Sequence, residues 1–367
     1  MTDLTIAYDP GSTSSRAFHT LKPFKPELLL MESEVAEVSP RSVKVYEANR
    51  LGNPAPENAA WIECKGEYRA VGFLAKNHFW ADLNLADSKL KLATWKALAL
   101  IGAIASKNGL PNGSTIRFGA LLPYGEYQDR ELFEQFLTSA IGGYRFRGEE
   151  RSFELESFVC RPEGFGLVSR GRGPGASLKE QIIVIVIVGF RDVSIYVMNR
   201  GVITRGISKD IGFSKFVETV QAQTAGLKMD VLTAAICKAG PKISARALAH
   251  LGRNLDPSLR DAEVTQIRTA IAVAREQYWL MLSNWLRHHI PAQSDEAIIG
   301  GGTAYYYERE FTTFFSGVKL NWCAELEEQI NRCYMPQVSQ HSLSYRLTDV
   351  YGFFNYLVGS ERPTAHV

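Results

Sequence analysis

Residues 4–19 read LTIAYDPGSTSSRAFH: a short apolar strand, a turn of small residues and a second strand. Glycine, proline, serine and aspartate favour tight turns, and the flanking runs have the length of strands. The same shape returns at residues 182–198, IIVIVIVGFRDVSIYVM, where seven β-branched residues predict a strand that is buried on both faces. When Gly11 is placed on Gly189, Asp9 falls on Ile187 and Arg16 on Ser194, so the repeat is one of shape. We expect a duplicated domain.

The composition sets the class of protein. A chain of 367 residues predicts about two domains, and 46% hydrophobic with 22% charged residues is typical of a globular protein. The formal net charge of +2 is too small to attract DNA or an anionic membrane over the whole surface of the protein. Any contact with nucleic acid must therefore be local.

The cysteines and the apolar runs indicate the compartment. Five scattered cysteines form no CxxC pair, which favours reduced thiols in the cytosol. The N-terminus carries no basic segment followed by an apolar stretch, and the longest apolar run, residues 182–188, is far shorter than a membrane span of about 20 residues. We expect a cytoplasmic protein without a membrane partner.

Hydrophobic periodicity places the remaining elements. Helices are expected over residues 88–106, 130–141, 261–289 and 347–357, and strands alternate with them, which indicates an α/β protein. The inward residues of the second helix are expected to be Leu132, Phe133, Phe136 and Leu137. The long third helix is expected to bury Val264, Ile267, Ile271, Ala274, Tyr278, Leu282 and Trp285.

The turn after the first strand has the composition of a phosphate site. Gly11, Ser12 and Thr13 would present backbone N–H groups and hydroxyls at one point, which suits phosphate oxygens. Asp9 could hold Mg²⁺ through water, and Arg16 could neutralise a phosphate. The same residues also make a good β-turn without any ligand.

Two further segments could take part in chemistry. Gly300, Gly301 and Gly302 would let a ligand approach the backbone closely, because no Cβ stands in the way. Glu163, between Pro162 and Gly164, could orient or deprotonate a water molecule. Taken alone, the first segment is also compatible with a strand-to-helix turn and the second with a solvated turn.

The order of these motifs resembles that of the actin-type ATPase superfamily. Asp9-x-Gly11-Ser12 resembles its first phosphate loop, residues 162–166 (PEGFG) its Pro-Glu hinge, and residues 298–302 (IIGGG) its adenosine motif. Within the superfamily, the chain is most similar to the bacterial, ParM-type plasmid-segregation actins. That similarity is carried by residues 71–75 (VGFLA), 121–123 (LLP), 210–213 (DIGF) and 349–353 (DVYGF).

The resemblance implies two ribonuclease H-like α/β domains that flank a nucleotide cleft. Domain I would comprise residues 1–175 and 336–367, and domain II residues 176–335. The implied ligands are ATP (or GTP) and Mg²⁺, and the implied assembly is a filament of identical subunits. The resemblance also implies roles for single residues. Asp9 would hold the Mg²⁺ through water, Glu163 would position the attacking water, and Arg16 stands where the family has Lys. The β- and γ-phosphates would be cradled by Gly11, Ser12 and Thr13, and the nucleoside would be faced by Gly300, Gly301, Gly302 and Thr303.

The second phosphate loop departs from the family pattern. The family reads Asp-x-Gly-Gly-x-Thr, whereas residues 187–192 read IVGFRD, so Gly189 is kept but Ile187 replaces the carboxylate. Phosphoryl transfer depends on positioning and charge neutralisation, so we expect ATP binding to persist and hydrolysis to be slow. Asp192 is an alternative carboxylate further along the turn.

These features lead to one functional hypothesis and two alternatives. The first is a nucleotide-dependent, filament-forming ATPase that segregates plasmid DNA through a DNA-binding adaptor protein. The alternatives are a small-molecule kinase of the same superfamily and a nucleotide-binding scaffold with little or no ATPase activity. Filament formation on adding ATP separates the first from the kinase, and phosphate release separates it from the scaffold.

Overall fold

The computed structural model describes residues 2–21, 25–83, 85, 89–170, 180–224, 226–339 and 344–359. They form two compact units, each with its own core. Unit 1 holds the described residues up to 170 and those from 323 onward, and unit 2 holds those from 180 to 322. Among the helices of the described part of the chain, none combines the length and hydrophobicity needed to cross a membrane.

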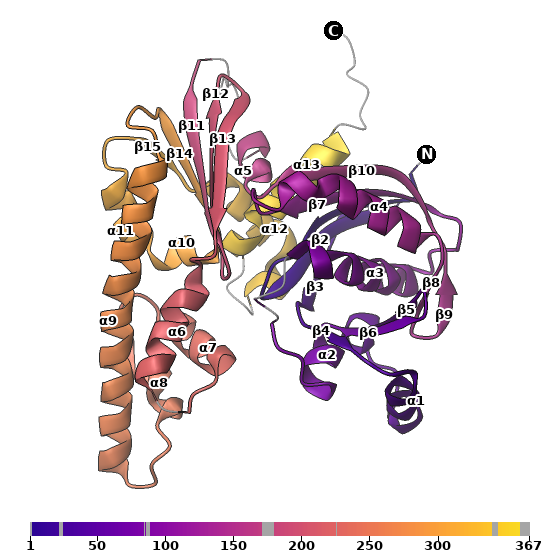
Figure 1. Cartoon of the computed structure of the whole chain (residues 1–367), viewed down its shortest axis with the longest axis horizontal. Coiled ribbons are helices and arrows are strands. Elements are labelled where there is room, and N and C mark those ends of the chain that lie inside the picture. The colour runs from indigo at the N-terminus through magenta and orange to yellow at the C-terminus, as the bar shows by residue number, and fades with distance from the viewer. Residues whose placement is uncertain are drawn as a thin grey trace. The chain divides into compact units, whose positions relative to one another are not determined.

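Unit 1 is built on a five-stranded sheet with the order β10–β7–β1–β2–β3 (Figure 1). The central strand β1 is buried throughout, pairs antiparallel with β2 and runs parallel to β7. β3 extends the sheet antiparallel to β2, and β10 extends it parallel to β7. The strand bounds are β1 Leu4–Asp9, β2 Ser14–Leu21, β3 Glu27–Glu32, β7 Thr115–Leu122 and β10 Glu154–Pro162.

A second, antiparallel sheet in unit 1 has the order β4–β6–β5–β8–β9. The buried helix α3 contributes to one core with residues of both sheets. Gly102 of α3 permits this packing, because a Cβ there would lie 2.4 Å from the Phe146 ring. The bounds are β4 Val35–Glu37, β5 Trp61–Cys64, β6 Glu67–Val71, β8 Tyr144–Phe146, β9 Glu149–Arg151 and α3 Lys89–Asn108.

The C-terminal helix α13 covers the first sheet of unit 1. Gly119 of β7 allows it to approach, because a Cβ at this position would lie 2.4 Å from Leu357 and 2.8 Å from Phe353. The other helices of the unit surround the two sheets. The bounds are α1 Pro40–Asn49, η1 Pro56–Ala59, α2 Phe73–His78, η2 Tyr127–Asp129, α4 Arg130–Ile141, α5 Phe165–Arg170, α12 Ala324–Ser339 and α13 Ser344–Gly359.

Unit 2 repeats the topology of the first sheet. Its order is β13–β12–β11–β14–β15, with the first strand again central, two antiparallel neighbours on one side and two parallel neighbours on the other. The expected duplication is therefore present in strand order and direction. The bounds are β11 Ile182–Val188, β12 Val193–Asn199, β13 Val202–Lys209, β14 Glu296–Gly300 and β15 Lys319–Asn321.

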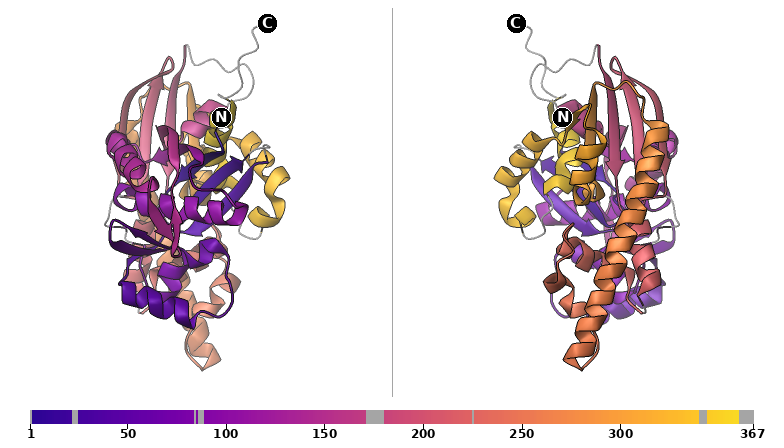
Figure 2. Two further views of the ribbon diagram at one scale, coloured as in Figure 1. Left: turned by 90° about the vertical axis from the view of Figure 1, so that its right-hand side faces the viewer. Right: turned by 90° about the vertical axis from the view of Figure 1, so that its left-hand side faces the viewer.

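The helices of unit 2 share one core with this sheet. Figure 2 shows α9 as a single long helix, and all seven residues predicted for its apolar face are buried. The bounds are α6 Phe213–Gln223, α7 Met229–Ala239, α8 Ala245–Leu248, η3 Ala249–Leu251, α9 Pro257–His289, α10 Gly302–Tyr306 and α11 Glu308–Phe314.

Two sequence-based expectations differ from the structure. Leu132 and Phe136 of α4 are 43% and 52% exposed, because the buried stripe of that helix runs instead through Phe133, Leu137, Ala140 and Ile141. Residues 323–335, expected in domain II, lie in unit 1. The reason is the packing of α12, whose Tyr334 ring lies 5.1 Å from Phe18 of β2.

Candidate functional site

The β1–β2 turn of unit 1 is shaped by a glycine. Asp9 and Arg16 are paired across the two strands, and the turn between them contains Gly11. A Cβ at Gly11 would lie 2.6 Å from the Ser14 carbonyl oxygen, so the turn admits no larger residue without rearranging. The Ser33 hydroxyl donates to the Ser12 carbonyl at 2.6 Å and ties the turn to the segment after β3.

Charged side chains lie on both strands beside this turn. Arg16 Nη1 donates to Asp9 Oδ2 at 2.6 Å, and the two side chains are only 14% and 12% exposed. An ion pair this poorly hydrated is stronger than one at the surface. The carboxylate that was predicted to hold Mg²⁺ and the cation that was predicted to hold phosphate therefore neutralise one another here.

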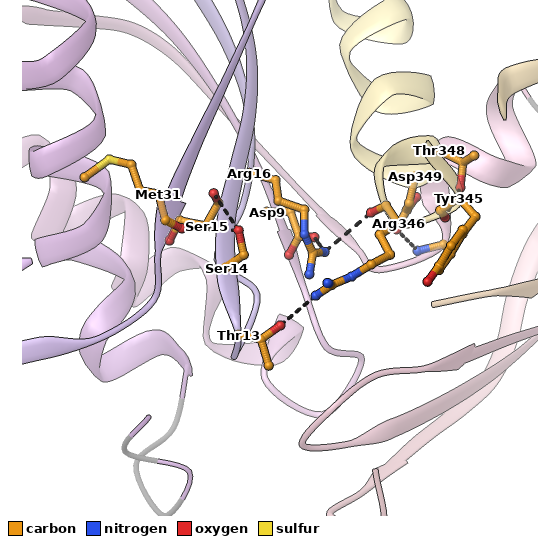
Figure 3. A network of polar contacts seen from close by, with 11 residues as sticks. Asp9, Thr13, Ser14, Ser15, Arg16, Met31, Tyr345, Arg346, Thr348 and Asp349 are labelled. Carbon is orange, nitrogen blue, oxygen red and sulfur yellow. Dashed lines mark hydrogen bonds and ion pairs between the residues drawn. The ribbon is translucent and has the colours of Figure 1, made fainter. Parts of the chain in front are cut away.

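A second arginine reaches the turn from α13. Figure 3 shows Arg346 extending toward Thr13, and its Nη2 donates to Thr13 Oγ1 at 2.7 Å. Arg16 Nη1 also lies 3.5 Å from the Arg346 carbonyl oxygen, so the two arginines are close neighbours. Sequence reasoning missed Arg346, since it lies more than 300 residues from the turn and three residues before the recognised 349–353 motif.

Glu163 lies in the turn between β10 and α5, where it is buried. Its backbone N–H donates to the Leu122 carbonyl at 2.7 Å, which holds the turn against the end of β7. The following residue, Gly164, has φ +92°, a conformation that favours glycine. The turn predicted from Pro162-Glu163-Gly164 is thus present in the structure with a buried carboxyl group.

Asp349 of α13 secures this turn. Its carboxylate accepts from the Gly164 N–H at 2.5 Å and from the Gly166 N–H at 2.9 Å. Desolvation raises the pKa of Asp349 to about 7, the Gly164 and Gly166 hydrogen bonds partly oppose the rise, and the charge of Asp9 adds to it. Asp349 belongs to the 349–353 motif, but the motif alone predicted no role for it at the site.

The helices α5 and α13 touch through their backbones at two glycines. A Cβ on Gly166 would lie 1.9 Å from the Asp349 carbonyl oxygen, and one on Gly352 would lie 2.4 Å from the Gly166 carbonyl oxygen. No other residue type fits either position without separating the helices. Consequently the turn that carries Glu163 and the helix that carries Arg346 are packed directly against one another within unit 1.

The β11–β12 turn of unit 2 is closed by its own backbone. The Gly189 N–H donates to the Asp192 carbonyl at 2.9 Å, and the Phe213 N–H donates to the Gly189 carbonyl at 3.1 Å. The Asp192 carboxylate is buried and accepts from Arg191 Nε at 3.1 Å. Ile187, the residue that replaces the family's carboxylate, is buried in β11 between Ser194 and Gly300 of the neighbouring strands.

The glycines after β14 adjoin this second turn. Gly301 has φ +90°, and a Cβ on it would lie 2.3 Å from the Val188 carbonyl oxygen, so glycine is required on both counts. Thr303 Oγ1 donates to the Gly189 carbonyl at 2.8 Å. Gly189, Gly301 and Thr303, which were predicted from separate motifs, are therefore neighbours.

The predicted residues form two groups, one in each unit. Unit 1 brings together Asp9, residues 11–13 and Arg16, and α13 links them to the turn of Glu163. Unit 2 brings together Gly189 and residues 300–303. Within the described residues, no three His, Cys, Asp or Glu side chains cluster as a metal site. The donor set still suits Mg²⁺ held through water and phosphate, because that ion needs only one or two protein carboxylates.

Solved structures of similar fold exist, although no family model and no curated protein matches the chain. An archaeal actin homolog, Ta0583, aligns over 97% of this chain and 99% of its own at 14% identity, with a TM-score of 0.60. The Alp12 filament structure aligns over 99% and 100% at 12% identity, with a TM-score of 0.57. A Bacillus thuringiensis ParM hybrid protein with ADP, which contains two ParM mutants, aligns over 98% of this chain and 50% of its own at 11% identity, with a TM-score of 0.58.

The chain therefore has the two-domain actin-like fold, as the sequence predicted. The solved structures that share this fold include ParM and Alp proteins as well as an archaeal actin homolog, which agrees with the resemblance found in the motifs. At 11–14% identity, the likeness is one of fold.

Proposed function

We propose that this protein binds ATP (or GTP) with Mg²⁺ and polymerises into filaments, and that slow hydrolysis regulates their disassembly. The observation that carries the proposal is the duplicated sheet. Each of its two equivalent turns contains a glycine, Gly11 or Gly189, on which a Cβ would come close to a backbone carbonyl oxygen of the same turn region. Backbone N–H groups in such turns favour phosphate oxygens. The Alp12 filament and the ADP-bound ParM hybrid support both parts of the proposal.

The residues of unit 1 would handle the phosphates. Gly11, Ser12 and Thr13 would donate to the β- and γ-phosphates, while Arg16 would exchange the Asp9 carboxylate for a phosphate oxygen. Asp9 would then be released to hold Mg²⁺ through water, and the ion would neutralise charge on the phosphates. Glu163 would orient the attacking water, and Asp349 would keep the Glu163 turn in place.

The residues of unit 2 would hold the nucleoside through the backbone. Gly189 and Gly301 let the turn after β11 and the turn after β14 pack closely together, and the Thr303 hydroxyl joins the two by a hydrogen bond. The nucleoside would lie against the partly exposed backbone of these turns. Because Ile187 offers no carboxylate, we expect hydrolysis to be slow rather than absent. The cellular role that fits such a filament is segregation of plasmid DNA in the cytoplasm, through a DNA-binding adaptor protein.

The test is right-angle light scattering with parallel phosphate release after adding Mg-ATP or Mg-GTP. The variants are Glu163→Gln and, as a matched control, Glu154→Gln, an exposed position on the same strand that leads to Glu163. We expect scattering to rise in all three proteins, with phosphate released by the wild type and the control only. A rise in scattering with no phosphate released by any of the three proteins, the wild type included, would favour the inactive scaffold. No scattering at any concentration or salt would overturn the filament proposal.

A further inference from the structure

The end of α2 places a large aromatic side chain in water. Trp80 follows the helix with φ +49°, while the Ala81 N–H donates to the Ala75 carbonyl at 3.0 Å and closes the last turn. Glycine or asparagine is usual at such a left-handed position, because a bulky side chain is strained there. Trp80 is also 84% exposed. Neither the backbone nor the packing of unit 1 therefore accounts for a tryptophan at this position.

Two more apolar residues are exposed close to Trp80 in the fold. Phe73 is the first residue of α2, and Val45 lies on α1. The rings of Tyr46 and His78 are 5.0 Å apart and join α1 to the end of α2. We call Val45, Phe73 and Trp80 the α1–α2 surface. Exposed aromatic and apolar residues that gather in this way are typical of protein–protein contacts.

A second exposed apolar surface lies on α4. Leu132 and Phe136, which the sequence predicted to point inward, stand one turn apart on the outer side of this helix. We call this pair the α4 surface. Figure 1 shows α4 and the two helices α1 and α2 in separate parts of unit 1, so a contact between the two surfaces requires two copies of the chain.

The helices that carry the two surfaces have opposite charge. Three basic residues stand against one acidic residue on α1 and α2, and three acidic residues stand against one basic residue on α4 and its N-cap. They are Arg41, Lys44, Lys76 and Glu47 in the first set and Asp129, Glu131, Glu134 and Arg130 in the second. Lys65, which donates to Ser139 at 2.7 Å, adds a positive charge only near the C-terminal end of α4. Opposite charges steer association and fix its orientation.

We propose that the α1–α2 surface of one copy docks on the α4 surface of a second copy, with Trp80 packed against Leu132 and Phe136. Tryptophan is prominent among the residues that dominate binding energy at interfaces. Because two different surfaces meet, every added copy leaves one surface of each kind free, and the contact continues into an open filament. The inference rests on the polymerisation proposed above and names one subunit contact for it.

Sedimentation velocity of the full chain with Mg-ATP measures the contact. The variants are Trp80→Asn and the double variant Leu132→Gln with Phe136→Gln. The matched control is the double variant Val273→Gln with Leu280→Gln, at two exposed positions of α9. We expect the concentration at which assembly begins to rise by about tenfold or more in the first two proteins and to change by less than about twofold in the control. Titration with fluorescent ATP should give the same affinity for all of them.

Trp80→Asn also tests whether the tryptophan serves the fold. Asparagine suits a left-handed backbone better than tryptophan does, so the melting temperature of this variant should equal or exceed that of the wild type while assembly is lost. A melting temperature below that of the wild type would mean that Trp80 stabilises unit 1, which would overturn its assignment to the contact.

Mixing the two assembly-deficient proteins tests the pairing itself. Trp80→Asn keeps its α4 surface, and the α4 double variant keeps Trp80. One copy of each should therefore form a dimer that cannot grow, whereas each protein alone stays monomeric at the same concentration. A mixture that stays monomeric would overturn the pairing of these two surfaces and would assign the α1–α2 surface to another partner.

The remaining outcomes separate this inference from the proposed function. Assembly of either variant at the wild-type concentration, or an equal loss in the α9 control, would overturn the contact and leave the proposed function intact. A wild type that binds nucleotide and never assembles would instead overturn the filament proposal, and the contact with it.

Discussion

The β1–β2 turn of unit 1 and the β11–β12 turn of unit 2 occupy the same place in two sheets of identical topology, yet their chemistry differs. The first turn spans residues 10–13, and the cross-strand pair nearest to it is the charged pair Asp9 and Arg16. The second spans residues 189–192 and is flanked by the apolar pair Val188 and Val193. The two sheets share their strand order, but the strand residues that border the first turn are charged and those that border the second are apolar.

The charged side chains of the second turn form an ion pair within that turn. Asp192 and Arg191 are both buried and bonded to one another within the turn. In unit 1, by contrast, Arg346 and Asp349 arrive from α13 and join the turn region to Glu163. We infer that phosphate chemistry belongs to unit 1 and that unit 2 contributes a backbone surface. The following predictions test this division, from the largest expected effect to the smallest.

Gly301→Ala should produce the largest effect, because it breaks the second turn itself. The alanine would have to adopt the φ of +90° that Gly301 has, which is unfavourable for a residue with a side chain. Its Cβ would also lie 2.3 Å from the Val188 carbonyl oxygen. We expect the free energy of unfolding to fall by about 4 kcal/mol or more, measured by chemical denaturation. Gly317→Ala, where a Cβ would meet nothing within 4 Å, is the control. Similar stability of both variants would contradict the steric argument.

Asp349→Asn should alter the pH dependence of stability in the nucleotide-free protein. The pKa of Asp349 is raised from 3.8 to about 7, so between about pH 4 and 7 the folded protein holds a proton that the unfolded chain has released. Its contribution to the free energy of unfolding is therefore lost as the pH rises through this range, by on the order of 4 kcal/mol.

The measurement is urea denaturation of wild type and Asp349→Asn from pH 4.5 to 8. The stability of the variant relative to wild type should increase with pH and level off above pH 7. The exposed Asp82→Asn is the control and should follow the wild type. A constant difference between wild type and Asp349→Asn at every pH would refute the shifted pKa.

Asp9→Asn and Asp192→Asn compare the two turns directly. Asp9→Asn should weaken Mg-ATP binding by roughly tenfold to a hundredfold and remove its dependence on Mg²⁺, because the carboxylate is lost. Asp192→Asn should leave nucleotide affinity within about threefold and instead lower stability by about 1–3 kcal/mol, because it weakens a buried ion pair. Titration with fluorescent ATP, with and without Mg²⁺, decides the matter. A larger loss in Asp192→Asn would mean that Asp192 substitutes for the missing carboxylate.

Arg16→Lys should have the smallest effect. Lysine keeps the positive charge beside Asp9 but lacks the planar fork, so we expect ATP affinity to change by less than about tenfold. The same titration measures it, with Arg16→Gln as the variant that removes the charge. Equal losses in the two variants would show that geometry, and not charge, determines the contribution of Arg16.

The sequence predicted the elements whose signal is local. The β-branched run in β11, the periodic face of α9 and the turn residues 10–13 and 189–192 were correctly interpreted, because each depends on neighbouring residues. The helix bounds of α4 were also predicted, but its inward face was not. Leu132 and Phe136 lie beside the buried stripe, and a short amphipathic pattern does not fix which side of the stripe faces solvent.

The site was predictable only in part. Asp9, Gly11 and Arg16 belong to one continuous motif, and the structure brings them together as expected. Arg346 and Asp349 reach the same region from the C-terminal helix, and their contacts depend on how α13 packs over the sheet of unit 1. The local sequence around Arg346 and Asp349 does not predict these contacts. The roles of Glu163 and residues 300–303 stay predictions.

The central claim is that a nucleotide bound at the first turn drives assembly, and sedimentation tests it most directly. Wild type and Asp9→Asn are centrifuged with Mg-ATP, with Mg-ADP and without nucleotide, and the pelleted fraction is measured. We predict that the wild type pellets with Mg-ATP and stays in the supernatant without nucleotide, whereas Asp9→Asn stays in the supernatant throughout. Equal pelleting of the two proteins, or a wild type that binds ATP and never pellets, would contradict the claim.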